Sequence, residues 1–215
     1  MRSLLGPPFL NFQFSIAPSA MVVCGTIHDL SVISYQSLSP FFSTLFSQED
    51  WVDAILTLSQ CSIDYLFCKM HRILILLLPS DSSRHNSPSR PDHLTKQLSL
   101  TSQIVNTESL NILLVTNKIF TFPLSAAISK AFSLFSMKTN PKHFKEIFVD
   151  FCLTESDKEM LFEDRRSLTY LSDGIRRAQL IVDSPANMMD TDGFFRQIKQ
   201  LFFGYAFPLS LSIRH

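Results

Sequence analysis

Cys61, Cys68 and His71 are the residues whose chemistry first suggests a metal site. Thiolates and imidazoles bind zinc, and a structural zinc site needs four such ligands, usually in closely spaced pairs. Six residues separate the two cysteines here, and no second pair follows at a suitable spacing. We therefore interpret both cysteines as reduced core thiols and the histidine as a surface residue.

A cluster of carboxylates is the second candidate. Asp183, Asp190 and Asp192 lie near Asn187 in the sequence, and oxygen ligands at this density could hold a divalent cation. Helix capping explains Asp190 and Asp192 without a metal, because the start of a helix favours negative charge and side-chain acceptors. We therefore expect helix caps at these positions and no cation.

The common catalytic patterns do not occur in the sequence. His85 and His93 flank a loop rich in serine and proline, but they lack the His-Glu-x-x-His spacing of zinc peptidases, so we interpret them as loop residues. No Gly-x-Ser-x-Gly segment is present to anchor a hydrolase triad. The five glycines are too scattered for a phosphate-binding loop. We predict no catalytic, cofactor-binding or metal-binding residue in these 215 residues.

The composition indicates a folded protein without a strong charge. Lysine and arginine number 19, equal to aspartate and glutamate, which removes the basic excess that nucleic-acid binding needs. A hydrophobic fraction of 46% argues against disorder. The longest apolar run, residues 73–78, is too short to cross a bilayer, and polar residues and prolines interrupt the first 20 residues where a secretory signal would be apolar. We expect a cytoplasmic protein with no membrane or nucleic-acid partner.

Strand-like and helix-like segments alternate along the chain. Short apolar, β-branched runs predict strands, and apolar residues at helical spacing predict helices. The expected strands are 21–28, 73–78, 111–116 and 146–153. The expected helices begin after Ser47 (with Trp51, Ile55 and Leu58 buried), after Asp92 (with Leu94 and Leu98), and at Ser125 (with Ile128, Phe132 and Phe135), whereas residues 36–46 are expected to form a loop. This alternation predicts an α/β domain with a mixed or mainly parallel sheet flanked by helices.

Two helices are expected after this domain. Leu168, Leu171, Ile175, Ala178 and Val182 recur at intervals of three and four, which predicts a helix with this set as its buried face. Arg176 and Arg177 lie off that face. A further helix is expected after a cap at Thr191 and Asp192, with Phe194, Ile198, Leu201 and Phe202 as its apolar face.

Two segments carry a more specific signal. They are Ser83–Ser89 (SRHNSPS) and Ser172–Arg176 (SDGIR), the second continuing into Ile181–Asp192 (IVDSPANMMDTD). Both resemble the leucyl aminopeptidase family, in particular its animal branch of probable aminopeptidases. The resemblance implies a macro-like N-terminal domain over residues 21–165 after an irregular lead-in at 1–20. It also implies a linker helix at 166–184 and the start of a catalytic domain, with a divergent tail, at 185–215.

The same resemblance implies a function. The family consists of metallo-exopeptidases that use two divalent ions, zinc or manganese, to release N-terminal residues from peptides, and its members commonly form hexamers. The family's Val-Gly-Lys-Gly and Asn-Thr-Asp-Ala-Glu-Gly-Arg motifs, which carry the catalytic and metal-binding residues, do not occur here. We therefore expect this 215-residue chain to be inactive alone. The alternative is that it associates as a non-catalytic module with a full-length aminopeptidase. A weaker third hypothesis, from the macro-like fold, is ADP-ribose binding.

Overall fold

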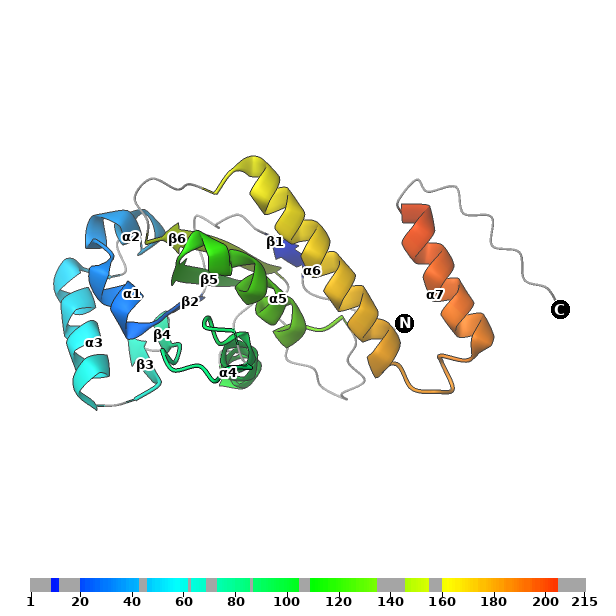
Figure 1. Cartoon of the computed structure of the whole chain (residues 1–215), viewed down its shortest axis with the longest axis horizontal. Coiled ribbons are helices and arrows are strands. Elements are labelled where there is room, and N and C mark those ends of the chain that lie inside the picture. The colour runs from blue at the N-terminus through cyan, green and yellow to red at the C-terminus, as the bar shows by residue number, and fades with distance from the viewer. Residues whose placement is uncertain are drawn as a thin grey trace.

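A six-stranded sheet forms the centre of the computed structural model (Figure 1). Its order is β1-β6-β5-β2-β4-β3, and every neighbouring pair is parallel except β3–β4. The strands are β1 (Phe9–Asn11), β2 (Ala20–Gly25), β3 (Tyr65–Cys68), β4 (Ile73–Leu77), β5 (Ser109–Thr116) and β6 (Glu146–Leu153). The structure describes residues 9–11, 20–42, 46–61, 63–68, 73–85, 87–104, 109–134, 146–154 and 160–204.

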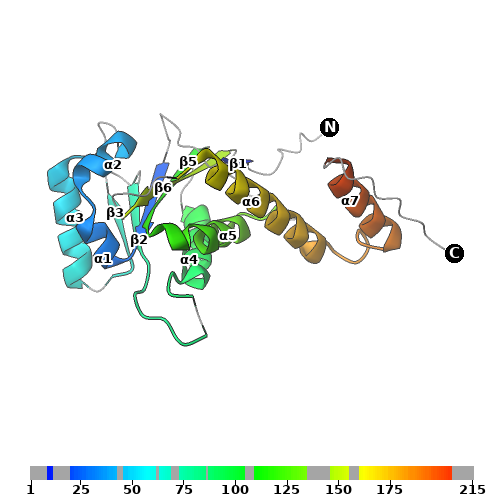
Figure 2. The same ribbon diagram turned by 45° about the horizontal axis from the view of Figure 1, so that its top comes forward.

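Helices cover both faces of the sheet (Figures 1 and 2). One face carries α1 (Ile27–Val32), α2 (Tyr35–Phe42) and α3 (Gln48–Cys61). The other carries α4 (Pro91–Ile104), the short 3-10 turn η1 (Lys118–Phe120), α5 (Thr121–Ala131) and the first part of α6 (Phe162–Asp183). A last helix, α7 (Thr191–Gly204), stands apart from the sheet and its helices. The predicted α/β class and mainly parallel sheet are confirmed.

The central strands are apolar along their length because both sides of the sheet are covered. On β5, Leu110, Ile112 and Leu114 face the α4–α5 side, and Leu113 and Val115 face the α1–α3 side. Such strands appear in sequence as continuous apolar runs, so the predicted strands at 73–78, 111–116 and 146–153 correspond to β4, β5 and β6. The strand predicted over 21–28 ends earlier, at Gly25, and His28 lies in α1.

The start of α3 follows the sequence prediction. The hydroxyl of Ser47 accepts a hydrogen bond from the backbone N–H of Asp50 (3.1 Å), and the Asp50 carboxylate accepts one from the Ser47 N–H (2.9 Å). This reciprocal pair satisfies backbone donors that a helix start leaves free. Trp51 and Leu58 are buried in α3 as predicted, and Ile55 is half-buried.

The loop predicted over residues 36–46 is wrong for its first part, because α2 is a helix. Pro40 lies inside α2 and cannot donate a backbone hydrogen bond to the carbonyl of Gln36. The hydroxyl of Ser39 donates to that carbonyl instead, at 3.0 Å. Phe42 is buried against Trp51, with ring centroids 5.7 Å apart, so tertiary packing stabilises this helix despite its proline.

The two outermost strands of the sheet were not predicted. Residues 1–20 were expected to be irregular, but Phe9–Asn11 forms β1 and pairs with Glu146–Phe148 of β6. The edge strand β3 pairs antiparallel with β4. Both are short, three and four residues, so their patterns are too brief to separate from loops.

The remaining helices begin near the predicted positions. Pro91 is the first residue of α4, where its missing N–H costs nothing, and Leu94 and Leu98 are fully buried. Helix α5 starts at Thr121, four residues earlier than predicted, and Phe132 caps its C-terminal end. Ile128 and Phe132 are buried, and Phe135 lies outside the described residues. None of the described helices is both long and apolar enough to span a bilayer.

Candidate functional site

The two cysteines of the zinc hypothesis lie on different elements. Cys61 is exposed at the end of α3, Cys68 is half-buried on β3, and His71 lies outside the described residues. The interpretation of Cys61 as a core thiol is therefore wrong, because its position at the helix end faces solvent. Across the part of the chain that the structure describes, no three His, Cys, Asp or Glu side chains are grouped to hold a metal ion.

Helix capping accounts for one carboxylate of the predicted acidic cluster. Asp190, rather than Thr191 or Asp192, precedes α7 as its cap: its Oδ1 accepts a hydrogen bond from the N–H of Gly193 at 2.7 Å. Its carbonyl accepts one from the N–H of Phe194 at 2.8 Å. Asp183 is the exposed last residue of α6, at the far side of the intervening turn.

The two histidines lie in different settings. His85 is exposed in the loop that follows β4, as expected. The interpretation of His93 as a loop residue is wrong, because it lies in the first turn of α4. Its Nδ1 is buried and has no hydrogen-bond partner among the described residues. The two side chains share no described polar contact, so they form no joint site.

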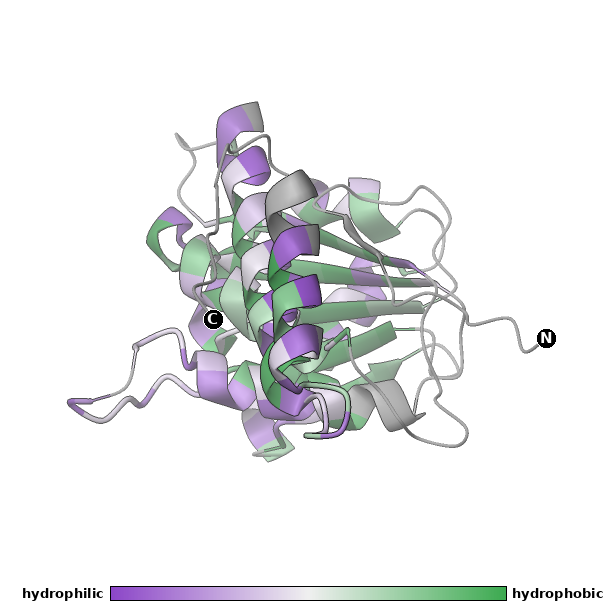
Figure 3. Ribbon diagram, turned by 90° about the vertical axis from the view of Figure 1, so that its right-hand side faces the viewer, coloured by the Kyte–Doolittle hydropathy of each residue, from purple (hydrophilic) through white to green (hydrophobic). Residues whose placement is uncertain are grey.

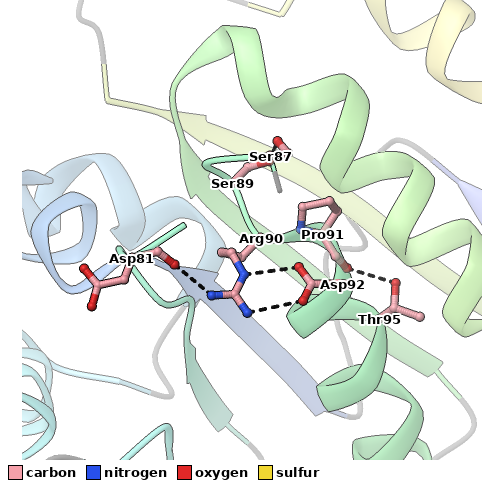
Figure 4. A network of polar contacts seen from close by, with 7 residues as sticks. All are labelled: Asp81, Ser87, Ser89, Arg90, Pro91, Asp92 and Thr95. Atoms are coloured by element: carbon pink, nitrogen blue, oxygen red, sulfur yellow. Dashed lines mark hydrogen bonds and ion pairs between the residues drawn. The ribbon is translucent and has the colours of Figure 1, made fainter. Parts of the chain in front are cut away.

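Hydrogen bonds of Arg90 stabilise the conformation of the loop between β4 and α4 (Figure 4). Its guanidinium binds both carboxylate oxygens of Asp92, at 3.2 Å each, and its Nη1 donates to the carbonyl of Asp81 at 2.7 Å. The backbone of Arg90 has a φ of 47°, which is rare for a residue other than glycine. The hydrogen bond from Arg90 holds the pKa of Asp92 below its usual value. This network closes the loop that contains the SRHNSPS segment.

A threonine in α4 joins this helix to α5. Thr95 Oγ1 lies 3.0 Å from the carbonyl of Pro91 and 3.1 Å from the carbonyl of Ala127 in α5. The hydrogen bonds of Arg90 order the loop, and that of Thr95 to Ala127 joins α4 to α5.

Two ion pairs fasten the beginning of α6, one to β6 and one to η1. Asp150 on β6 accepts from Arg165 at 2.8 Å, and Lys118 in η1 lies 2.7 Å from Asp164. The hydrogen bond from Lys118 lowers the pKa of Asp164. Asp164 also accepts from the N–H of Leu161 and so caps the helix start.

A buried arginine fastens the middle of α6. The side chain of Arg176 is 4% exposed, and its Nε donates to the carbonyl of Phe132 at the end of α5 across 2.9 Å. One turn later, Gln179 Nε2 lies 3.3 Å from the carbonyl of Lys130. A cation at this place is favourable because the C-terminal end of a helix carries unpaired carbonyls and partial negative charge.

The predicted buried face of α6 is therefore only partly right. Leu168 is buried as expected, but the face continues through Ser172 and Arg176, each four residues further on. Val182, expected to be buried, is 80% exposed. The sequence signal that could have identified this face is the spacing of four from Leu168, which the neighbouring apolar residues obscured.

The end of α6, the following turn and the start of α7 present uncovered apolar side chains. We call Val182, Met188 and Phe194 the distal apolar surface; their exposed fractions are 80%, 52% and 47%. Figure 3 shows α7 in front of the sheet, with apolar and polar residues alternating along it. Phe194, one of the residues predicted for the apolar face of this helix, is exposed, whereas the side chains of Leu201 and Phe202 lie outside the described residues. Large contiguous apolar patches mark interaction sites.

Comparison with known proteins identifies relatives of this architecture. A family model described as M17 aminopeptidase N-terminal domain 2 matches residues 20–141. The mouse (Mus musculus) protein named probable aminopeptidase NPEPL1 is 28% identical over 201 residues, which cover 89% of this chain and 38% of the relative. Leucine aminopeptidase 1 from Caenorhabditis elegans is 30% identical over 118 residues, which cover 55% of this chain and 23% of that protein.

Solved structures show the same fold. The leucine aminopeptidase of C. elegans superposes with a TM-score of 0.73 at 19% identity, covering 92% of this chain and 40% of that one. A leucyl aminopeptidase from Trypanosoma brucei, solved with bestatin, gives a TM-score of 0.71 at 16% identity and covers 94% and 42%. The chain thus spans about two fifths of the length of these solved structures.

Proposed function

Because this chain belongs to the M17 aminopeptidase family, we propose that it serves as the family's non-catalytic N-terminal domain and positions a catalytic domain through α6 and α7. The observation that carries this proposal is the distal apolar surface. This surface lies on the end of α6 and on α7, the described elements that extend away from the sheet (Figure 1). We propose that a catalytic domain packs there. Covering apolar area stabilises a complex by roughly 25 cal/mol per Å².

The described residues do not fit a metal centre of the kind that aminopeptidases of this family use. A pair of divalent ions needs several carboxylate, imidazole or similar ligands converging on one place, and the described residues bring no three His, Cys, Asp or Glu side chains together. We therefore assign no hydrolytic step to them. In this proposal, peptide hydrolysis and its zinc or manganese ions belong to the catalytic domain.

A peptidase assay tests this division of labour. The purified 215-residue chain is incubated with a leucyl p-nitroanilide substrate and manganese or zinc, and a full-length relative serves as the positive control. We expect p-nitroaniline to be released no faster than in the same metal-containing buffer without protein. Release above that rate, from protein freed of contaminating peptidases, would show that these residues are catalytic and would overturn the proposal.

The distal apolar surface also favours a second role, in which the chain associates with a full-length aminopeptidase as an interaction module. Size-exclusion chromatography with the full-length mouse relative tests it, and we expect co-elution. The variant Phe194→Asp should abolish it, whereas Val52→Asp should not, because Val52 is equally exposed, at 48%, but lies on α3. Co-elution that survives Phe194→Asp would refute this surface as the contact.

Two further parts of the proposal concern location and assembly. We propose a cytoplasmic location, on the basis of the family and of four free cysteines. We also propose that the chain can self-associate through the distal apolar surface when no partner covers it. Cell fractionation tests the first, and the elution volume of the purified chain tests the second, since a monomer at all concentrations would contradict it.

A further inference from the structure

Helix α6 is held to the sheet domain at two separate places. The proximal clamp consists of the ion pairs of Asp164 and Arg165 with Lys118 and Asp150. The distal clamp consists of Arg176 and Gln179, whose side chains donate to the carbonyls of Phe132 and Lys130. The two clamps are separated by about 16 Å along the helix axis, at a rise of roughly 1.5 Å per residue.

Two points of attachment define the direction of a helix, whereas one point permits it to pivot. Near the beginning of α6, Leu168 is buried and Leu171 packs partly buried against the same core. At the distal clamp, the buried groups are polar: Ser172 and Arg176. Leu180 and Ile181 are half-buried, and Val182 and Asp183 at the end of the helix are exposed. Hydrogen bonds to the end of α5 therefore contribute to the direction in which α6 leaves the domain.

We propose that Arg176 is a positioning residue that fixes the direction of α6, and with it the place of α7, relative to the sheet domain. Its planar guanidinium occupies a buried position against the C-terminal end of α5, where the dipole of that helix favours a cation. Gln179 adds a second, weaker contact on the same helix end. Loss of the distal clamp leaves α6 attached mainly at its beginning and free to pivot there.

The geometry of α6 amplifies such a pivot. From Arg165 to Val182 the helix is about 25 Å long, so a pivot of about 20° displaces its end by about 9 Å. The consequence for a catalytic domain rests on the proposed function, because that domain would move with α6 and α7. The clamp itself does not rest on it, since the direction of α6 is a property of this chain alone.

Pulsed electron spin resonance on the 215-residue chain tests the proposal. Spin labels are attached at Asp53→Cys on α3 and Val182→Cys on α6, both exposed, in a background in which Cys61 and Cys68 are replaced by serine. We expect one narrow distance distribution in this background. The variant Arg176→Met, which keeps an unbranched stem but removes the guanidinium, should broaden and shift that distribution by several ångströms.

The matched control is Arg177→Met, on the same helix turn but only half-buried, and it should leave the distribution unchanged. Circular dichroism confirms that each variant is folded. If Arg176→Met does not fold, Gln179→Ala provides the second test and should give a smaller broadening. A folded clamp variant with an unchanged distribution would overturn the proposal. If Arg176→Met broadens the distance distribution but the parent chain does not co-elute with a full-length aminopeptidase, the role of Arg176 is supported and the interaction role is refuted.

Discussion

The Nε atom of Arg176 donates a hydrogen bond to the carbonyl oxygen of Phe132 across 2.9 Å, and this contact joins α6 to the end of α5. The guanidinium is almost fully removed from water, and this desolvation lowers the pKa of Arg176 from its ordinary value. The nearby charge of Asp173 acts in the opposite direction. A charged group is retained in this position because it compensates the carbonyls at the helix end.

Removal of the guanidinium should destabilise the domain. We expect Arg176→Met to lower the free energy of unfolding by about 1–3 kcal/mol, because a buried carbonyl loses a charged donor. Arg177→Met is the control, and its effect should stay within about 0.5 kcal/mol, as for other surface positions. Urea denaturation followed by circular dichroism measures both. Equal effects of the two substitutions would show that Arg176 contributes no specific contact.

Two glycines should respond in opposite ways to alanine. At Gly193, a Cβ atom would lie 2.2 Å from the carbonyl oxygen of Met188, so Gly193→Ala must displace the turn before α7. At Gly174, inside α6, a Cβ would meet nothing within 4 Å. We expect Gly193→Ala to reduce the hydrogen-exchange protection of the first turn of α7, and Gly174→Ala to raise the free energy of unfolding by about 0.5–1 kcal/mol.

Each glycine variant controls for the other, because the chemical change is identical. The hydrogen-exchange protection of α7 in Gly174→Ala should equal that of the parent protein. The free energy of unfolding of the sheet domain in Gly193→Ala should also equal the parent value, since α7 stands apart from the sheet (Figure 1). Unchanged protection of α7 in Gly193→Ala would contradict the close approach of Met188.

The ion pair of Lys118 with Asp164 should make stability depend on pH. Because the folded state lowers the pKa of Asp164, the pair contributes above the unfolded-state pKa of about 3.9 and is lost as the pH falls through the lower folded-state value. Both side chains are about one third exposed, so we expect at most about 1 kcal/mol. Unfolding free energies of the parent and of Asp164→Asn should therefore differ at pH 7 and converge in acid.

The control for this prediction is Glu163→Gln, which removes an exposed carboxylate from the same turn of α6. It should produce a smaller difference at pH 7, since Lys118 pairs with Asp164. A difference for Asp164→Asn that persists unchanged in acid would show that the substitution acts through packing rather than through charge.

Thiol reactivity should distinguish the four cysteines. Burial raises the pKa of the Cys24 thiol, and burial together with the charge of Asp150 raises the pKa of Cys152 to about 11. Because the thiolate is the reactive form, both should resist a disulfide reagent in the folded protein. We expect rapid reaction of exposed Cys61 and slower reaction of half-buried Cys68, followed by mass spectrometry, and reaction of all four after unfolding. Labelling of Cys24 in folded protein would contradict the buried assignment.

The sheet could be predicted from sequence where its strands are covered on both faces. The apolar runs of β4, β5 and β6 have no other stable environment, and β6 was predicted with its observed bounds. Helix α2 could not be predicted in this way, because Pro40 argues against a helix and the compensating bond from Ser39 is visible only in three dimensions. Local propensity was overridden there by packing of Phe42.

The face of α6 shows why the candidate surface was harder to predict. Apolar spacing assumes that a helix packs along its whole length, whereas Val182 and Asp183 at the end of α6 are exposed. Arg176 appears polar in the sequence, and its burial follows from the position of the end of α5, which is remote in the chain. The spacing of Phe194 predicted an apolar helix face but could not show that this side chain is exposed.

The place of β1 in the sheet has a consequence for synthesis of the protein. Phe9 pairs with Glu146, roughly 140 residues later in the chain, so β1 is synthesised well before the strand with which it pairs. At a translation rate of about 5–20 residues per second, residues 9–11 wait on the order of ten seconds before β6 emerges. Strands β2, β4 and β5 can pair with one another in the meantime. Strand β1 can join the sheet only after β6 has been added beside β5.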